Sequence, residues 1–596
     1  MVLSSQSSRR ISALAAACLL SVALPAVPAL AQKTKTKKPA EPAQLEISHT
    51  VSIPTIEAVG SNLDEATLKA ILSGDVVNNA DDLAGLNASS ITVPEINVTI
   101  TAAEGDDVDD LSFVLNDFVL TNVVDGVAET ISIAGTEMTA DDVNFSFGAI
   151  SAAKFNIAGV LGVYGLVDAS APAEMATIYT DFQAEGGQMV SDEVTCAIGP
   201  VAGAEFKARP LSMPLAEIIT LAEQMEDDPD TLDPAVLAKF VRVYADMLTA
   251  FETSEVTMGG IECNGVDDDD RAMRFTIGNM VMGGMSPGIY PAISVDGVEI
   301  DVEDDGRMSV DNLLLKETDL SALIATLQSA PDDIDEKWFE DNARGMIPSF
   351  GGFSFSGFSM DIPDPDDSDA RIQADIGEFD LTLASYINGI PSLLDVWAEN
   401  IQAEIPEGTG EESFEMLRSF GVTAIDAGFR LALAWDEVDN AISVEEVSFS
   451  GEDLASVALS GLITNATIDL FSEDLDTALA TAMDLAVNAL DLEIVDEGLS
   501  DILLSVAAAE QGVDPATLRP VFAGLAQGTV IGMMAGAADA AKLGDAINAF
   551  VSGKAKTLQI GLTAKDEAGI GLLDFMAAED DPASLLTKLN VSATAK

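Results

Sequence analysis

The stretch Phe353-Ser-Phe-Ser-Gly357-Phe-Ser-Met360 decides the fold, because it describes a strand that changes phase at a glycine. Apolar residues alternate with serines on both sides of Gly357, but the alternation slips by one residue there. Alternation with a period of two is typical of a half-buried strand, and a slip at glycine is typical of a β-bulge, since glycine adopts backbone conformations that other residues resist. We therefore expect Gly357 to be a bulge position with a positive φ.

The same pattern, apolar-Ser-apolar-x-Gly-x-x-apolar, occurs three more times. Its glycines are Gly135 in 131–138, Gly297 in 293–300 and Gly451 in 447–454. A second alternating stretch follows each copy, at 143–150, 308–315, 371–379 and 456–463. A bulged strand with an antiparallel return is a twisted hairpin, and its repetition indicates a repeated β architecture. The sequence predicts an α+β fold in which repeated antiparallel hairpin units form a large curved sheet, whose concave face can hold a core, a helix or an apolar ligand.

Composition divides the chain into five regions. Residues 1–31 are expected to be a signal peptide, with Arg9 and Arg10, an apolar run at 11–27 and a small-x-small cleavage pattern at 29–31. Residues 32–44 are predicted to be a flexible basic, proline-containing tether. We expect a repeated β-rich region with helical insertions, a mainly helical Ala/Gly-rich region, and terminal strands with a tail. Their respective ranges are 45–464 (with the insertions at about 210–252), 465–555 and 556–596.

The charge balance indicates which partners the protein avoids. The formal net charge is −72, and removal of Arg9 and Arg10 with the signal peptide would make it −74. Such a field repels nucleic acids and favours cations or basic partners, so no nucleic-acid binding is expected. Because 48% of the residues are hydrophobic, the chain can still bury cores. We predict an acidic periplasmic or secreted protein.

The cysteines support an oxidising compartment. Cys196 and Cys263 are the two that would remain after signal-peptide cleavage, and an even pair in an exported chain predicts a disulfide. Each lies in a strand-like stretch with a helical pattern between them, so a bridge would hold the two strands together. Two buried free thiols are the alternative. Lipidation of Cys18 is disfavoured because Ala15 occupies a position where a large aliphatic residue is expected.

One acidic segment is a candidate calcium site. Asp301, Glu303 and Asp305 stand at the first, third and fifth positions before a glycine, as in a calcium loop. The twelfth position is Asn312, which supplies no bidentate carboxylate. The alternative, a hairpin turn with solvated acids, is favoured. Calcium or another divalent cation is the one cofactor that the sequence suggests.

A glycine ladder marks the helical region. Gly524, Gly528, Gly532 and Gly536 recur every fourth residue within 521–538, a stretch without charged residues. On a helix they form one stripe against which a second backbone can pack closely. We expect this stripe to pack on the protein's own sheet or on a neighbouring helix. Insertion into a membrane is the alternative, and the sequence leaves membrane association open.

Signatures of catalysis are missing from the sequence. His49 is the only histidine, and the chain contains no Gly-x-Ser-x-Gly, Walker or Gly-x-Gly-x-x-Gly motif. The sequence therefore favours a non-enzymatic envelope protein, either structural or binding an apolar ligand such as a lipid. The alternative is a carboxylate-dependent hydrolase acting on envelope polymers, because acidic residues are plentiful.

Three segments carry a resemblance to known proteins. They are Leu83-Ala-Gly-Leu-Asn-Ala-Ser-Ser-Ile-Thr-Val-Pro-Glu-Ile96, Ala441-Ile-Ser-Val-Glu-Glu-Val-Ser-Phe-Ser-Gly-Glu-Asp-Leu454 and Leu585-Leu-Thr-Lys-Leu-Asn-Val591. They resemble uncharacterised exported proteins of alphaproteobacteria, and the arrangement is similar to that of YdgA-like and AsmA-like envelope proteins. The resemblance implies a Gram-negative periplasmic setting.

Overall fold

The computed structural model describes most of the chain from residue 45 onwards. The described residues are 45–73, 75–104, 107–140, 143–167, 174–214, 217–218, 221, 233–267, 271–364, 371–405, 418–419, 421–534, 539–580 and 582–596. The predicted signal peptide and tether lie outside them. The chain divides into two compact units. Unit 1 runs up to Asp304 and includes Leu320–Asn342, whereas unit 2 comprises Asp305–Asp319 and Ala343–Lys596.

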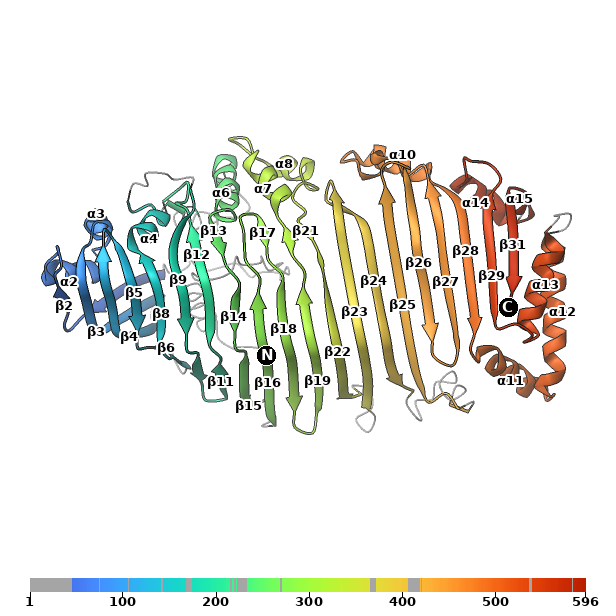
Figure 1. Ribbon diagram of the computed structural model, residues 1–596, viewed down its shortest axis with the longest axis horizontal. Coiled ribbons are helices and arrows are strands. Elements are labelled where there is room, and N and C mark those ends of the chain that lie inside the picture. Colours follow the sequence, from blue (N-terminus) through green and yellow to red (C-terminus); the bar gives the residue numbers. More distant parts are fainter. Residues whose placement is uncertain are drawn as a thin grey trace. The chain divides into compact units, whose positions relative to one another are not determined.

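Unit 1 is mainly strand, with short helices at the ends of its strands (Figure 1). Its elements are β1 (Leu45–Ser52), β2 (Glu57–Val59), α2 (Glu65–Leu72), η1 (Val77–Asn79), α3 (Ala80–Ala84), β3 (Ala88–Glu104), β4 (Asp107–Val124), β5 (Val127–Ile133), β6 (Gly135–Ala140), β7 (Val143–Phe147), β8 (Ile150–Asn156), α4 (Ile157–Val163), β9 (Ala176–Ala184), β10 (Gly187–Val190), β11 (Val194–Ile198), β12 (Val201–Ala208), α6 (Pro234–Met247), β13 (Phe251–Thr253), β14 (Val256–Met258), β15 (Ile261–Val266), β16 (Ala272–Met282), β17 (Ile289–Tyr290), β18 (Ile293–Val302), α7 (Ser321–Gln328) and α8 (Glu336–Asp341).

Unit 2 has longer strands and carries its helices towards the C-terminus (Figure 1). Its elements are β19 (Gly306–Leu315), β20 (Thr318–Asp319), β21 (Ser349–Phe350), β22 (Gly352–Pro363), β23 (Arg371–Ile387), β24 (Ile390–Glu404), β25 (Ala424–Asp436), β26 (Ala441–Gly451), β27 (Ala455–Thr464), η2 (Ile468–Phe471), α10 (Leu475–Met483), β28 (Ala486–Asp496), α11 (Leu499–Gln511), α12 (Pro515–Met533), α13 (Ala540–Val551), β29 (Thr557–Ala564), β30 (Ile570–Gly571), α14 (Leu572–Asp580), α15 (Pro582–Thr587) and β31 (Leu589–Ala595).

The prediction of an α+β fold built on a large curved antiparallel sheet is confirmed. Its long strands pair with their sequence neighbours through antiparallel hydrogen bonds. Three of the predicted hairpin returns are observed as the pairs β6–β7, β22–β23 and β26–β27. Sequential antiparallel pairing makes β22–β28 of unit 2 a meander, whereas unit 1 also pairs strands that are not sequence neighbours, such as β5 with β8 and β11 with β15.

The phase slip at Gly357 is real, but it is not a one-sided bulge between β22 and β23. Gly357 has the expected positive φ, 63°. The register is nevertheless the same on both sides of it, because Ser356 pairs with Glu378 and Phe358 pairs with Ile376. Gly377 stands opposite Gly357, so both strands step together and form an in-register crease. Gly297, with a φ of 89°, forms a similar crease opposite Gly278.

The pair β23–β24 also keeps its register here, and a true bulge absorbs the slip between β24 and β25. The register of β24 against β25 shifts between Ala398 and Ile401. Asn400 lies inside this shift with a φ of 54°, and Gly428 lies opposite on β25. Asparagine tolerates the left-handed conformation better than most residues. The bulge that the sequence pattern predicted at a glycine is therefore made by an asparagine.

The expected positive φ is wrong at Gly135 and Gly451. At Gly135, the first residue of β6, the crease is made by the neighbouring strand, where Asp117 of β4 has a φ of 49°. Gly451 is the last residue of β26, and the positive φ of the following turn, 56°, belongs to Asp453. In both places an aspartate adjacent to the predicted glycine takes the left-handed conformation.

The helical predictions are partly confirmed. Asp233 caps α6 by accepting a hydrogen bond from the Ala235 amide, and α11 ends at Gly512, which has a left-handed φ of 63°. The expectation that 465–555 is mainly helical is wrong at 486–496, since α10 ends at Met483 and the strand β28 begins at Ala486. The sequence Ala486-Val-Asn-Ala-Leu490 is Ala-rich, but it pairs with β27 because its apolar residues complete the sheet.

Candidate functional site

The sheet of unit 2 has one apolar face. Residues that stand directly opposite one another in antiparallel strands project to the same side of a sheet. One row across five strands consists of Phe429, Phe449, Val457, Ile494 and Leu558. The next row consists of Leu431, Val447, Leu459, Leu492 and Ile560. Both rows are free of polar side chains.

Much of this apolar face is open to solvent in the described residues. Phe449 is 60% exposed and Phe429 is 36% exposed, and Val447 and Val457 beside them are also exposed. Leu558, in the same row but closer to the C-terminal helices, is buried. Exposure is therefore concentrated on β25, β26 and β27, in the middle of the unit 2 sheet.

Aromatic side chains extend the apolar face onto the preceding strands. Phe353 and Phe355 of β22 stack on Phe379 of β23, with ring centroids 5.3 and 5.1 Å apart. The crease at Gly357 keeps Phe358 on this face, 6.1 Å from Phe355. The apolar alternation changes phase at Gly357, where the backbone also changes direction. The apolar side chains before and after Gly357 therefore lie on the same face of the sheet.

Helices close one edge of this face. Met534, Ala540 and Val591 form a buried cluster against which Leu562 of β29 packs. Figure 1 shows α12 and α13 beside β31, the last strand of unit 2. The C-terminal helices therefore cover the apolar residues of β29 and β31, while those of β25–β27 remain exposed.

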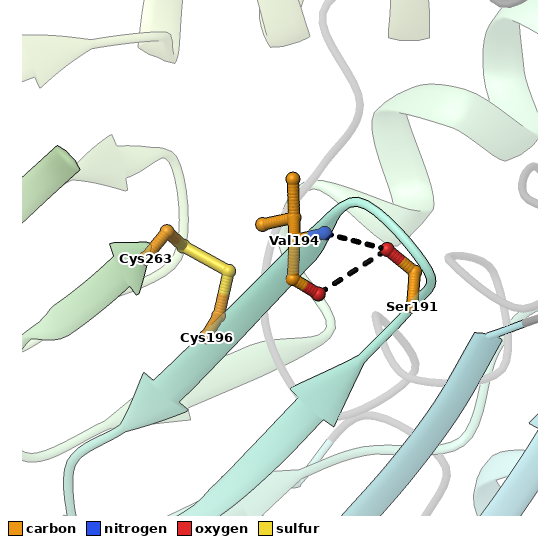
Figure 2. The surroundings of a disulfide bond; sticks show 4 residues. All are labelled: Ser191, Val194, Cys196 and Cys263. Atoms are coloured by element: carbon orange, nitrogen blue, oxygen red, sulfur yellow. Dashed lines mark hydrogen bonds between the residues drawn. A yellow bond between two sulfur atoms is a disulfide. The ribbon is translucent and has the colours of Figure 1, made fainter. Parts of the chain in front are cut away.

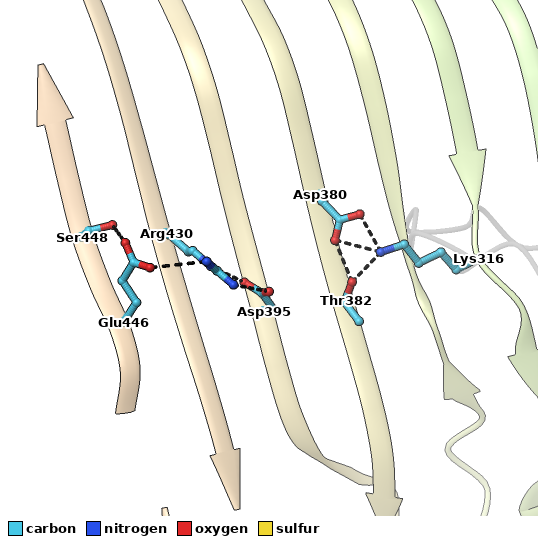
Figure 3. A network of polar contacts seen from close by, with 7 residues as sticks. All are labelled: Lys316, Asp380, Thr382, Asp395, Arg430, Glu446 and Ser448. Atoms are coloured by element: carbon cyan, nitrogen blue, oxygen red, sulfur yellow. Dashed lines mark hydrogen bonds and ion pairs between the residues drawn. The ribbon is translucent and has the colours of Figure 1, made fainter. Parts of the chain in front are cut away.

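The opposite face is polar and is tied together across strands (Figure 3). The Arg430 guanidinium donates two hydrogen bonds to Asp395, at 3.1 and 3.0 Å, and one to Glu446 at 3.4 Å. Ser448 donates to Glu446 at 2.6 Å. The hydrogen bond with Asp395, followed by the attraction of Asp395 and Glu446, raises the pKa of Arg430 and keeps it charged. Arg430 thus links three strands.

A second polar group lies beside it (Figure 3). The Lys316 ammonium donates to both carboxylate oxygens of Asp380, at 2.8 and 2.7 Å, and to the Thr382 hydroxyl at 2.5 Å. Both charged side chains are about four-fifths buried. These contacts attach the end of β19 to β23. The Lys316 ammonium, the Asp380 carboxylate and the Thr382 hydroxyl are hydrogen-bonded to one another.

A shallow acidic hollow of about 570 Å3 lies in the polar part of unit 2. Its acidic lining residues are Glu445, Glu446, Asp491 and Glu493. Glu446 is held by Arg430 and Ser448, and Glu493 accepts a hydrogen bond from Gln559 at 2.5 Å. Glu446 and Glu493 therefore form hydrogen bonds with side chains of the same sheet, and these contacts connect neighbouring strands.

Hydrogen bonds lower the pKa of several carboxyl groups outside the hollow. The side-chain hydrogen bond from Thr177 lowers the pKa of Glu205, and that from Lys588 lowers the pKa of Asp574. Burial raises the pKa of Asp496, but hydrogen bonds from Ser500 and Gly498 outweigh it and leave the pKa lowered.

Cys196 and Cys263 are bonded to each other in unit 1 (Figure 2). They stand opposite one another on β11 and β15, and the sulfur atoms are 2.09 Å apart. The bond connects strands separated by 67 residues in the sequence, with α6 between them. The disulfide joins two neighbouring strands of the sheet, as the sequence predicted.

The calcium hypothesis receives no geometric support. Asp301 lies on β18, Glu303 follows it, and Asp304 has a φ of 60° before β19 begins at Gly306. Across the part of the chain that the structure describes, no group of three or more His, Cys, Asp or Glu side chains is arranged to hold a metal ion. Asp305, the third proposed ligand, lies in the same turn.

The glycine ladder does not pack as expected. Gly524, Gly528 and Gly532 lie on α12, and a methyl group added to any of them would meet no atom within 4 Å; Gly536 lies outside the described residues. The close approach between α12 and α13 is made instead by Gly544, whose added Cβ would lie 2.8 Å from Ile531. Among the described helices, none is both long and apolar enough to cross a membrane.

The exposure of the apolar face was the main feature that the sequence did not reveal. The alternation of apolar residues at 429–435 fits the strand β25, but alternation does not show whether a helix covers the apolar side of a strand. His49, the only histidine, lies on β1 in unit 1, away in the sequence from these strands. The signal for exposure is the length of the run of strands from β22 to β27, whose described residues include no helix of the size of α12 or α13.

Comparison with known proteins gives one family match. A family model described as "Uncharacterized protein" matches residues 448–596, which include β27–β31 and the C-terminal helices. No curated protein and no solved structure matches the chain. The match therefore agrees with the resemblance to uncharacterised proteins over the C-terminal part of the chain, and it names no activity.

Proposed function

We propose that this chain is a non-enzymatic exported envelope protein that binds the acyl chain of a lipid on the apolar face of unit 2. The observation that carries the proposal is the exposure of Phe429, Phe449, Val447 and Val457 on neighbouring strands. Soluble proteins rarely leave a contiguous apolar patch uncovered, and such patches mark binding sites. An acyl chain fits this face because the two rows present only hydrocarbon side chains.

The surrounding structure supports a binding surface rather than an incomplete core. The cross-strand contacts of Arg430 and Lys316 join neighbouring strands on the polar side of the sheet. The C-terminal helices cover one edge and leave the centre open.

The proposal is tested by replacing Phe449 with Glu in the full chain. Burying a phenylalanine side chain contributes about 1.5–3 kcal/mol, so we expect affinity for a monomeric fluorescent fatty acid to fall by roughly ten-fold or more. Native mass spectrometry of the purified wild-type protein should show a bound lipid. Ser450→Glu is the matched control, since it adds the same charge to the same strand on the opposite face and should leave binding unchanged.

Two results would contradict lipid binding. One is a wild-type protein that binds no fatty acid and carries no lipid. The other is an equal loss of affinity in Phe449→Glu and Ser450→Glu, which would assign the effect to charge instead of to the apolar face. Activity against envelope glycans, lost on replacement of Glu446 or Glu493, would favour the hydrolase.

A further inference from the structure

Two short helices of unit 2 meet at the same end of β28. α10 ends at Met483, shortly before Ala486 begins β28, and α14 begins at Leu572, directly after Gly571 of β30. Ala486 and Gly571 pair with one another. This pairing holds the end of α10 and the start of α14 near each other, and both helices lie along the upper end of unit 2 in Figure 1.

Both helices direct large apolar side chains into solvent. On α10 these recur every fourth residue, and on α14 they occupy most of the first turns. The exposed side chains are Leu475, Leu479 and Met483 on α10, Leu572, Leu573, Phe575 and Met576 on α14, and Ile468 on the preceding η2. Leu573 is 73% exposed and Leu475 is 62% exposed, which are higher values than that of Phe449.

This end is anchored, so the exposed side chains belong to a fixed surface. Phe471 of η2 is buried and packs edge-on against Trp435 of β25, with ring centroids 5.0 Å apart. The Trp435 indole donates a hydrogen bond to the Ala466 carbonyl at 2.6 Å. Ala478, on the inner side of α10, is also buried. The segment thus packs with one side against the sheet and presents the other to solvent.

The exposed end is continuous with the apolar face. Trp435 pairs with Ile442, and Ile442 pairs with Ile463, so these residues form the last row of the apolar face at this end. Phe471 packs on that row. An acyl chain leaving a membrane at α10 and α14 would therefore meet the apolar face directly behind them.

We infer that α10 and α14 dock the protein on the surface of a zwitterionic lipid bilayer, from which the apolar face receives its acyl chains. The inference rests on the proposed function. Exposed Leu, Phe and Met side chains gain free energy when they leave water for the boundary between headgroups and acyl chains. The net charge of −72 opposes both a second copy of the chain and an anionic membrane, and among lipid surfaces it therefore favours a neutral one.

The test is flotation of the full chain with phosphatidylcholine vesicles. In the variant Leu479→Gln/Leu573→Gln/Met576→Gln we expect the partition coefficient to fall by about ten-fold or more, because three apolar insertions are lost. All three positions are exposed, so the fold should be retained. The matched control is Leu503→Gln/Leu525→Gln/Met533→Gln on α11 and α12, where side chains are similarly exposed and flotation should be unchanged.

Fatty-acid binding by the same variants separates this inference from the proposed function. The helix variant should still bind monomeric fatty acid, whereas Phe449→Glu should lose fatty-acid binding and still float. Absence of flotation by the wild type, or equal flotation by the helix variant, overturns docking and leaves acyl-chain binding standing. A wild-type dimer in sedimentation experiments that the helix variant abolishes would assign this surface to a second copy and also overturns docking.

Discussion

The glycine ladder of α12 provides the sharpest test of the structure, because two interpretations predict opposite signs. If Gly524, Gly528 and Gly532 face solvent, replacing each with alanine should stabilise the helix, since glycine in a helix interior is about 0.5–1 kcal/mol less favourable than alanine. An added Cβ meets no atom within 4 Å at any of the three. We expect the triple variant to gain roughly 1.5–3 kcal/mol of local stability in α12.

Hydrogen exchange of the α12 amides measures this local free energy, and calorimetry of the full chain shows whether the unfolding temperature follows. Gly544→Ala on the facing helix is the contrasting variant. There the new Cβ would lie 2.8 and 2.9 Å from the Cγ1 and Cδ1 atoms of Ile531, so these atoms must move. We expect it to be at least about 1 kcal/mol less favourable than Gly528→Ala. Destabilisation by the three ladder substitutions would refute the reasoning and show that the stripe packs closely after all.

Three further predictions concern the sheet and its ends. Gly297→Ala should cost about 1–2 kcal/mol of unfolding free energy, because the φ of 89° at Gly297 is strained for alanine although no atom lies within 4 Å of the added Cβ. Gly278→Ala should cost more, because the added Cβ would lie 1.6 Å from a carbonyl oxygen of β18. Equal urea midpoints for the two variants would contradict this order. The pKa of the buried Asp496 lies below 3.8 in the folded protein, so the contribution of this carboxylate to the unfolding free energy is fully present above pH 3.8 and is lost as the pH falls through the folded pKa. Asp496→Asn should therefore lower the unfolding free energy at neutral pH and flatten its pH dependence below pH 3.8. Unfolding curves recorded above and below pH 3.8 test this prediction. Replacing Cys196 and Cys263 with alanine should lower stability by about 2–4 kcal/mol in calorimetry, and non-reducing peptide mapping of the wild type that finds free thiols would contradict the bond.

The parts of the fold that local pattern determines could be predicted from the sequence. The alternation in 353–360 and its slip at Gly357 predicted the strand, the positive φ and the antiparallel return, all of which depend on residues close in sequence. The cap of α6 by Asp233 followed from the same kind of local rule. The pairing of Cys196 with Cys263 required only that two strand-like stretches become neighbours.

Other features depend on neighbouring strands and could not be read locally. At Gly135 the left-handed residue is Asp117, which lies on the adjacent strand, and between β24 and β25 it is Asn400. The sequence pattern shows that the apolar alternation changes phase, but it does not show which strand carries the residue with a positive φ. In the same way, the Gly524 stripe looked like a packing surface, whereas the helix contact depends on Gly544.

The crease explains how so long a sheet keeps one continuous apolar face. β23 alone has 17 residues, and strict alternation along it would require one unbroken phase. Instead Ile376 and Phe379, three positions apart, lie on the same face, because Gly377 steps in register with Gly357. A side chain at Gly377 would place its Cβ 2.9 Å from that of Asn400, so the step also needs glycine for space. The coordinated slip over three strands therefore preserves the apolar face across the bend, and it keeps Phe355 in contact with both Phe358 and Phe379.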